Sequence, residues 1–337
     1  MRSFAIATVG LVLGACPKKA PDGPKPTAGV GCPAASGVFV ASYLAPEEGA
    51  KGQGHTGWVL PLHDKTVDTL DGVADYATID AAAAQAAGVP APPQDLWLML
   101  PQKGGGVAPP CRVTYGSYYA AAIDAPAKNI AYGIELSGCN PPADANLELA
   151  VALASAEPPG QCAIVAPKLA GARFGEVDKD GKWSRPTKET PIPPAIASLV
   201  AQRECAAPAC EKLWSIGQVD LGGKPLAWTG VVNWLAIPDG AKPEQQCEWK
   251  AETWSGLFVA GGDGAPVAVT EGQDHPLSLF AVLVDGGGAK AMLATGPGEY
   301  TAYDYANGAV TVGRHLVWLR PHPDSYTDAQ HLGPDCP

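Results

Sequence analysis

The sequence predicts a mainly β protein of α+β class, in which antiparallel sheets built from consecutive hairpins form a sandwich or a barrel stapled by disulfides. Apolar runs of strand length alternate with Gly-rich turns through most of the chain, which is typical of antiparallel sheets. Helical periodicity is confined to two short stretches. Eight cysteines follow the first 16 residues, and an even number is what a set of disulfides requires.

Strands are predicted throughout the first half of the folded part, which begins near Gly37. Each is a short apolar run bounded by turn-forming residues, and the runs cover residues 38–43, 57–62, 96–100, 111–121, 129–137, 147–154 and 163–166. The first two are expected to be neighbours across a Gly-rich loop. In 147–154, Leu and Val alternate with Glu and Ala, which predicts one apolar face.

Two short helices are predicted among these strands. The stretch 78–87 has a capping residue, an Ala-rich body, and a stop at Gly88 and Pro90. The stretch 194–203 begins with Pro194, which suits the first helical turn, and it carries an apolar face.

Four consecutive hairpins are predicted after Cys210. Their turns contain Gly or Asn, which tolerate positive φ, at residues 222–223, 261–264, 285–288 and 307–308. The last, Asn307-Gly308, is the strongest two-residue hairpin signal. The sequence has no recurring blade motif, so a sandwich or barrel is favoured over a propeller.

The chain is predicted to have four parts. Residues 1–15 are a signal peptide, 16–36 a lipid anchor and Pro-rich tether, 37–190 a β-rich domain with one short helix, and 191–337 a helix followed by an antiparallel β domain. The boundary between the two domains is expected in the Pro- and Thr-rich stretch 186–195.

The N-terminus indicates export. Arg2 precedes a short apolar run that is too short to span a bilayer and ends in Leu13-Gly14-Ala15-Cys16. This ending resembles the lipobox of bacterial lipoproteins, in which an aliphatic residue and two small residues precede Cys. The resemblance covers residues 1–16 only. It implies cleavage before Cys16, acyl chains such as palmitate on Cys16, and a place in the cell envelope, by default at the outer membrane and facing the periplasm or the surface. The alternative is an ordinary secreted protein with an incidental cysteine.

The acidic composition excludes some classes of function. The formal net charge is −11, whereas phosphate binding needs a basic surface, so a nucleic-acid partner is disfavoured. The sequence has no Gly-rich nucleotide loop, so we expect no cofactor. It also has no GxSxG elbow, the motif that nucleophilic hydrolysis would favour.

The cysteines after Cys16 are the disulfide candidates: Cys32, Cys111, Cys139, Cys162, Cys205, Cys210, Cys247 and Cys336. A metal site would favour CxxC-like pairs, and the sequence contains none, so we expect no metal. Eight cysteines allow many connectivities. The pairings favoured are Cys139 with Cys162 and a bridge that holds the C-terminal tail through Cys336.

One acidic stretch is similar to a calcium-binding loop. Glu176, Asp178, Asp180 and Gly181 match its first positions, but Thr187 stands where the loop needs a bidentate Glu. A hairpin turn between two short strands is therefore favoured.

A group of histidines and aspartates near the C-terminus is the candidate catalytic or zinc site: His315, His322, Asp324, Asp328 and His331. Imidazole and carboxylate together can bind zinc or transfer protons. No ligand spacing organises these residues, and a Pro-rich turn is the competing interpretation. The pair His63-Asp64, with His55 in a Gly-rich loop, is a weaker candidate.

The tryptophans of the second half suggest a core and a glycan surface as alternatives. Trp228 and Trp234 share one face of a strand and are predicted to be core. Trp249 and Trp254 fall on opposite faces of a regular strand, so one of them could be exposed and stack on a sugar beside Tyr303 or Tyr305.

These features predict an exported, lipid-anchored module of the cell envelope that binds a protein or glycan or has a structural role, and they favour a non-enzymatic function. The alternative is an envelope hydrolase that uses His315, His322, Asp324 and His331. Convergence of these four side chains in one concave pocket would favour the enzyme.

Overall fold

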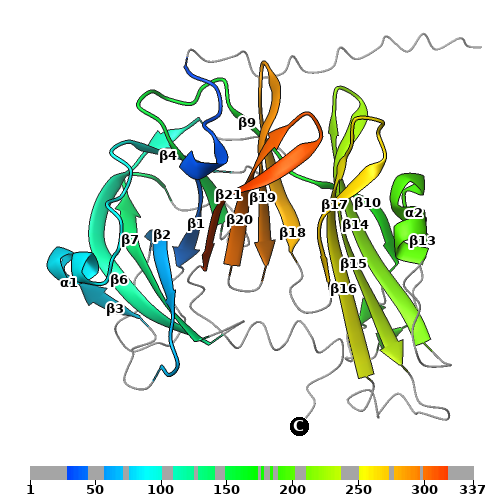
Figure 1. Ribbon diagram of the computed structural model, residues 1–337, viewed down its shortest axis with the longest axis horizontal. Helices are drawn as coiled ribbons and strands as arrows, with labels where there is room; N and C mark the ends of the chain where they lie inside the picture. The colour runs from blue at the N-terminus through cyan, green and yellow to red at the C-terminus, as the bar shows by residue number, and fades with distance from the viewer. Residues whose placement is uncertain are drawn as a thin grey trace, which may run out of the picture.

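The computed structural model describes residues 29–44, 57–70, 76–100, 109–124, 128–140, 149–173, 176–177, 183–184, 189–201, 210–236, 250–272, 277–296 and 299–317. These residues form a mainly β protein whose sheets are antiparallel and stacked, as the sequence predicts. Its helices are α1 (Ala81–Ala86), α2 (Pro194–Ala201) and the short 3-10 helix η1 (Ala35–Gly37). Figure 1 shows three large sheets following one another across the molecule.

The first sheet has eight strands in the order β3-β6-β7-β2-β1-β8-β4-β5. Their bounds are β1 (Val38–Leu44), β2 (Gly57–Thr66), β3 (Ala77–Ile79), β4 (Leu96–Met99), β5 (Cys111–Arg112), β6 (Thr114–Asp124), β7 (Lys128–Ser137) and β8 (Leu149–Ala154).

This first sheet closes on itself. The strand β5 pairs with β4, while β6, which follows β5 after Val113 alone, pairs with β7. The N–H of Val113 donates to the carbonyl of Leu96 (3.1 Å), so it continues the contact with β4. The result is a barrel in which β3 is attached to the outside of β6. Closure leaves the barrel strands without free edges at this point.

The barrel is filled by apolar side chains from all around its wall. Trp58 and Leu60 of β2 lie there with Leu96 and Leu98 of β4, all buried. The helix α1 begins where the carboxylate of Asp80 accepts the N–H of Ala83 (2.7 Å), which satisfies one of its free N–H groups.

The second sheet has five strands and is the middle layer of the molecule. Its order is β21-β20-β19-β18-β9, with β9 (Ala163–Val165), β18 (Ser278–Asp285), β19 (Gly288–Gly296), β20 (Glu299–Ala306) and β21 (Ala309–Val317). Leu283 and Leu293 pack against the outside of the barrel, whereas Val282 and Met292 pack in the opposite direction. The strands β18 and β19 are buried on both faces, which explains their nearly continuous apolar runs.

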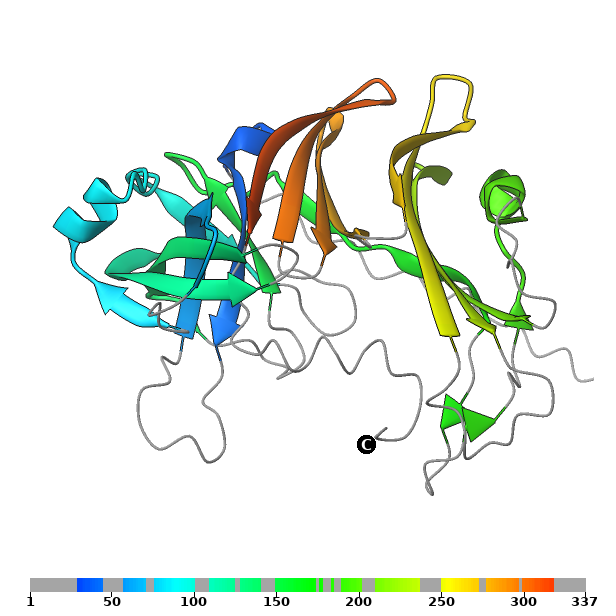
Figure 2. The same cartoon turned by 60° about the horizontal axis from the view of Figure 1, so that its bottom comes forward.

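The third sheet has six strands in the order β13-β10-β14-β15-β16-β17. Their bounds are β10 (Lys168–Arg173), β13 (Glu189–Thr190), β14 (Cys210–Leu221), β15 (Lys224–Ala236), β16 (Lys250–Ala260) and β17 (Pro266–Gly272). One face meets the middle sheet through residues such as Val219 and Leu257. The other face carries Trp214 and Trp228, which pack against Ile196 of α2. The layers therefore run from barrel to middle sheet to six-stranded sheet to α2 (Figures 1 and 2).

The strands predicted from the sequence are present, and each of the four predicted hairpins is formed by consecutive paired strands. One detail differs. The run 147–154 was expected to bury one face, but β8 buries both: Ala150 and Ala152 face the barrel interior, while Val151 and Leu153 face the middle sheet. Ala150 and Ala152 pack there among larger side chains such as that of Trp58.

The predicted division between residues 190 and 191 stays a prediction. The strands β9 and β10 precede that point, yet they pair with β18 and β14, which follow it. Any domain boundary there would cut through two sheets.

Candidate functional site

Two disulfides link described parts of the chain, and their pairing differs from the favoured one. Cys32 is bonded to Cys162, and Cys111 to Cys139. The prediction of Cys139 with Cys162 is therefore wrong. The side chain of Cys210 and the whole of Cys205, Cys247 and Cys336 lie outside the described residues, so the bridge to the C-terminal tail stays a prediction.

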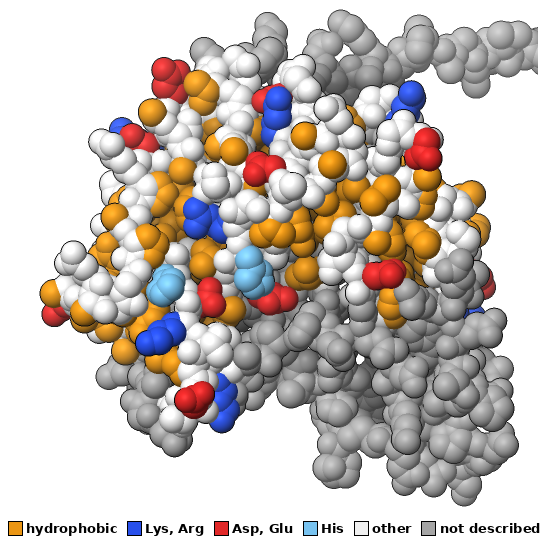
Figure 3. Space-filling view, in the orientation of Figure 1, with side chains coloured by type: hydrophobic (Ala, Val, Ile, Leu, Met, Phe, Trp, Pro, Cys, Tyr) orange, Lys and Arg blue, Asp and Glu red, His pale blue; other side chains and the backbone are white. Residues whose placement is uncertain are grey.

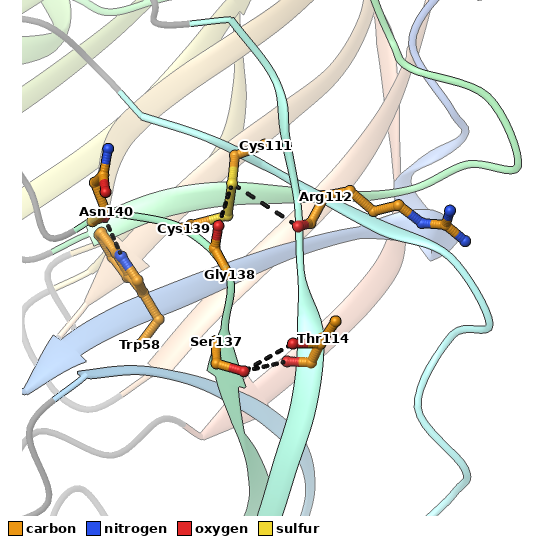
Figure 4. The surroundings of a disulfide bond; sticks show 8 residues. All are labelled: Trp58, Cys111, Arg112, Thr114, Ser137, Gly138, Cys139 and Asn140. Atoms are coloured by element: carbon orange, nitrogen blue, oxygen red, sulfur yellow. Dashed lines mark hydrogen bonds between the residues drawn. A yellow bond between two sulfur atoms is a disulfide. The ribbon is translucent and has the colours of Figure 1, made fainter.

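The barrel explains why Cys139 bonds to Cys111. Cys139 follows the end of β7, and β7 pairs with β6, whose start lies next to Cys111. Figure 4 shows this end of the barrel, where the indole N–H of Trp58 donates to the carbonyl of Asn140 (3.0 Å). The disulfide therefore ties the residues after β7 to the point where the continuous segment β5–β6 changes its pairing partner from β4 to β7.

Cys162 lies in another layer, beside the first described residues of the chain. The N–H of Val30 donates to the carbonyl of Pro158, and the carbonyl of Val30 accepts the N–H of Gln161 (both 3.1 Å). This short contact brings Cys32 to Cys162, 130 residues along the chain. The bond fixes the N-terminal segment to the start of β9.

Of the C-terminal candidates, the structure describes His315 alone. It lies on β21 with its side chain about half exposed. Its Nδ1 is 3.0 Å from the hydroxyl of Thr301, and its Nε2 is 3.7 Å from a carboxylate oxygen of Glu299. His322, Asp324, Asp328 and His331 lie outside the described residues, so the alternative of an envelope hydrolase stays a hypothesis.

The remaining sequence candidates do not assemble a reactive group in the described part of the chain. His63 stacks on Tyr132 with ring centroids 6.1 Å apart, whereas the carboxylate of Asp64 accepts the N–H of Val317 (3.4 Å). His55 lies outside the described residues. Among those residues, no three His, Cys, Asp or Glu side chains come close enough to hold a metal ion.

The two short strands on either side of the acidic loop support its interpretation as a hairpin. The strands β11 (Glu176–Val177) and β12 (Trp183–Ser184) pair antiparallel, with Val177 opposite Trp183. Asp178 and Asp180 lie outside the described residues.

The two tryptophans that decide between these alternatives, Trp228 and Trp254, are core residues. Trp228 is 1% exposed, as predicted, and Trp254 is 2% exposed. Trp254 packs on the α2 side of the six-stranded sheet, whereas Tyr303 packs on the opposite side, against the middle sheet. A glycan platform made of Trp254 and Tyr303 is therefore wrong. Trp249 and the side chain of Trp234 lie outside the described residues.

A surface that the sequence did not reveal lies at the outer strands of the two large sheets. We define the open edge as Val267 and Val269 of β17 with Val310 and Val312 of β21. Val269 and Val310 pack partly into the core between the sheets, while Val267 is 49% and Val312 is 64% exposed. Figure 3 shows hydrophobic side chains gathered where the middle and six-stranded sheets meet on this face.

The hairpins that carry the open edge touch one another. Gly308, at the tip of the β20–β21 hairpin, lies so close to the β16–β17 hairpin that an added Cβ would be 3.0 Å from the carbonyl oxygen of Ala260. Its φ of +81° also favours glycine. One sequence signal for the edge was available: Pro266 begins β17, and proline in a sheet is typical of the first residue of a strand or of an edge strand.

No family model, curated protein or solved structure matches this chain. Neither of the described α-helices is long and apolar enough to cross a membrane.

Proposed function

We propose that this chain is an exported, lipid-anchored protein of the cell envelope that binds a protein partner. The export signal and the lipid site rest on Leu13-Gly14-Ala15-Cys16 and on the resemblance of this segment to a lipobox. The two disulfides support a place outside the cytoplasm, because such bonds persist in oxidising compartments. Two or more acyl chains on Cys16 would hold the protein at the membrane.

The anchor gives a direct prediction. Cys16→Ser removes the thiol that would carry the lipid, so the protein should move from the membrane pellet to the soluble fraction after cell fractionation. Mass spectrometry of the wild-type N-terminal peptide should show acyl chains on Cys16. Ala15→Ser keeps a small residue in the motif and is the matched control. A protein that stays in the pellet after Cys16→Ser would contradict the lipid anchor.

The open edge is the observation that supports binding. The strand β17 is an edge strand that is paired with β16 alone among the described strands, whereas β21 also contacts β2 and η1. A strand edge offers N–H and C=O groups to an added extended segment. The exposed valines offer apolar contact beside it. Exposed apolar side chains next to a strand edge are typical of partner sites.

Charge favours one kind of partner over another copy of the chain. The net charge of −11 makes two copies repel each other, whereas a basic partner is attracted. We therefore infer that the occupant of β17 is an extended protein segment in which apolar residues alternate with Lys or Arg.

The test uses the full chain in detergent and a synthetic peptide of alternating valine and lysine as the probe. We expect the peptide to bind, and Val267→Lys to weaken it by about tenfold or more, which is ~1.4 kcal/mol. Leu169→Lys is the matched control, because Leu169 is also exposed (65%) but lies on β10, away from the open edge. Isothermal titration calorimetry would measure the affinities.

Three outcomes would overturn this site. Equal binding of a peptide of alternating valine and glutamate would contradict the preference for a basic partner, and a complete lack of binding would count against β17. Self-association abolished by Val267→Lys in analytical ultracentrifugation would assign the edge to a second copy instead.

A further inference from the structure

The segment that precedes the barrel crosses one end of the middle sheet, and we call residues 29–37 the strap. The Sγ of Cys32 lies 3.3 Å from the carbonyl oxygen of Val284 on β18. Farther along, the N–H of Ala35 donates to the carboxylate of Asp304 on β20 (2.7 Å), and η1 lies beside β21 (Figures 1 and 2). The strap therefore crosses the sheet before the chain enters β1.

The end of the strap next to the barrel is packed tightly against β21. The Arg314 guanidinium donates to the carbonyl of Ser36 and lies 4.0 Å from the centre of the Phe39 ring. A Cβ at Gly313 would be 2.6 Å from the Cβ of Ala35, so glycine allows this close approach. Ala35 is fully buried. The strap is thus part of the folded structure.

The other end of the strap is joined to the segment that leaves the barrel. Val30 exchanges two backbone hydrogen bonds with Pro158 and Gln161 (both 3.1 Å), and Cys32 is bonded to Cys162. The residues just before β1 and the residues just after β8 are therefore held together by a covalent bond as well as by hydrogen bonds.

The loop that this disulfide closes contains the whole barrel. The described strands of the first sheet run from Val38 to Ala154, between Cys32 and Cys162, whereas the described strands of the middle and six-stranded sheets all follow Cys162. A pull on the chain before residue 32 therefore reaches β9 through the disulfide and does not pass along the chain of the barrel.

The barrel would be exposed to such a pull if the disulfide were absent. The chain enters the barrel at Val38 and leaves it at Ala154, and Val38 lies opposite Leu153 in the antiparallel pairing of β1 with β8. Tension between these neighbouring ends would separate β1 from β8 one residue pair at a time. Because a single hydrogen bond contributes little to stability, bonds that are loaded singly yield more easily than bonds that are loaded together.

We propose that the Cys32–Cys162 disulfide is a mechanical bypass, which carries tension between the lipid anchor and a partner on β17 past the barrel and into β9. This inference rests on the proposed function, because Cys16 precedes the disulfide and β17 follows it. The strand β9 continues into β10, and β10 pairs with β14 of the sheet that carries β17. The barrel is thereby left without load.

Magnetic tweezers would test the bypass on the full mature chain, with one handle at the N-terminus in place of the lipid. The second handle is inserted at Gly262, in the turn before β17, where an added Cβ meets no atom within 4 Å. At constant force, the Cys32→Ala, Cys162→Ala variant should yield about tenfold sooner than the wild type, or faster still, because forced unfolding follows the unfolding rate. Its first extension should be roughly 400 Å, the length of the extended barrel chain.

A matched control removes the other disulfide. Cys111 and Cys139 both lie inside the bypassed loop, so the Cys111→Ala, Cys139→Ala variant should keep the wild-type lifetime under this pull to within about twofold. Because the handles stand in for the lipid and the partner, a failure of the anchor in cell fractionation or of the peptide in calorimetry would not alter this result.

A second pair of handles, at Gly262 and Gly286, separates the bypass from a general loss of stability. This pull does not span the Cys32–Cys162 bond, and the entropy that a disulfide removes belongs to the unfolded chain, so the Cys32→Ala, Cys162→Ala variant should keep its lifetime there. Equal shortening in both pulling geometries would overturn the bypass. A first extension from the two sheets, with the barrel still folded, would also overturn it, because the barrel would then need no protection.

Discussion

Replacing Cys32 and Cys162 together by alanine is expected to lower the free energy of unfolding by roughly 2–5 kcal/mol. The two residues are 130 apart in the sequence, so the bond closes a long loop and removes much conformational freedom from the unfolded chain. It also fixes the segment around Val30, which hydrogen-bonds to residues 158–161. Urea denaturation at constant pH, followed by tryptophan fluorescence, would measure the loss.

The second disulfide provides the control for this prediction. Cys111 and Cys139 are 28 residues apart, and the loop-closure relation makes the loss for the Cys111→Ala, Cys139→Ala variant about 1.4 kcal/mol smaller. An equal or greater loss for this shorter loop would show that local contacts at the end of the barrel, such as the Trp58–Asn140 hydrogen bond, outweigh chain entropy.

The hairpins could be predicted from the sequence because their signals are local. Asn307 and Gly308 have φ of 53° and 81°, and few residues other than Asn and Gly accept such values. Asp80 likewise caps α1 through a contact only three residues away. In each case the residue that determines the geometry lies within the element that it shapes.

The arrangement of the sheets could not be predicted in the same way. The barrel closes because one continuous segment pairs first with β4 and then with β7, and no local pattern encodes which distant strand lies alongside. The same limitation explains the wrong pairing of Cys139, whose true partner is set by the neighbouring strand. It also explains why the two buried faces of β8 were not expected, since alanine is compatible with either a buried or an exposed face.

The candidate surfaces also depend on contacts between residues that are distant in the sequence. The exposed valines of the open edge belong to apolar runs that look like any other strand. Apart from Pro266 at the start of β17, only the sheet order shows that β17 and β21 are edge strands. His315 could be named from the sequence, but its neighbours Thr301 and Glu299 come from the adjacent strand β20.

Leu293→Ala is expected to lower the free energy of unfolding by about 2–5 kcal/mol. Leu293 is fully buried on β19 and packs against the barrel with Val40, Val151 and Leu153. The middle sheet is held from both sides, so the surrounding wall cannot collapse freely into the space that the substitution leaves. Urea denaturation would measure the change, and circular dichroism would confirm that the variant still folds.

Leu169→Ala is the matched control, because it removes the same atoms from a leucine that is 65% exposed on β10. Its effect should stay within about 0.5 kcal/mol. Met292→Ala tests the opposite face of the middle sheet, where that side chain packs with Leu257 and Val259 of the six-stranded sheet. Comparable losses for Leu293→Ala and Met292→Ala, with none for Leu169→Ala, are what a sheet buried on both faces requires. A loss on one face alone would mean that the other interface contributes little to stability.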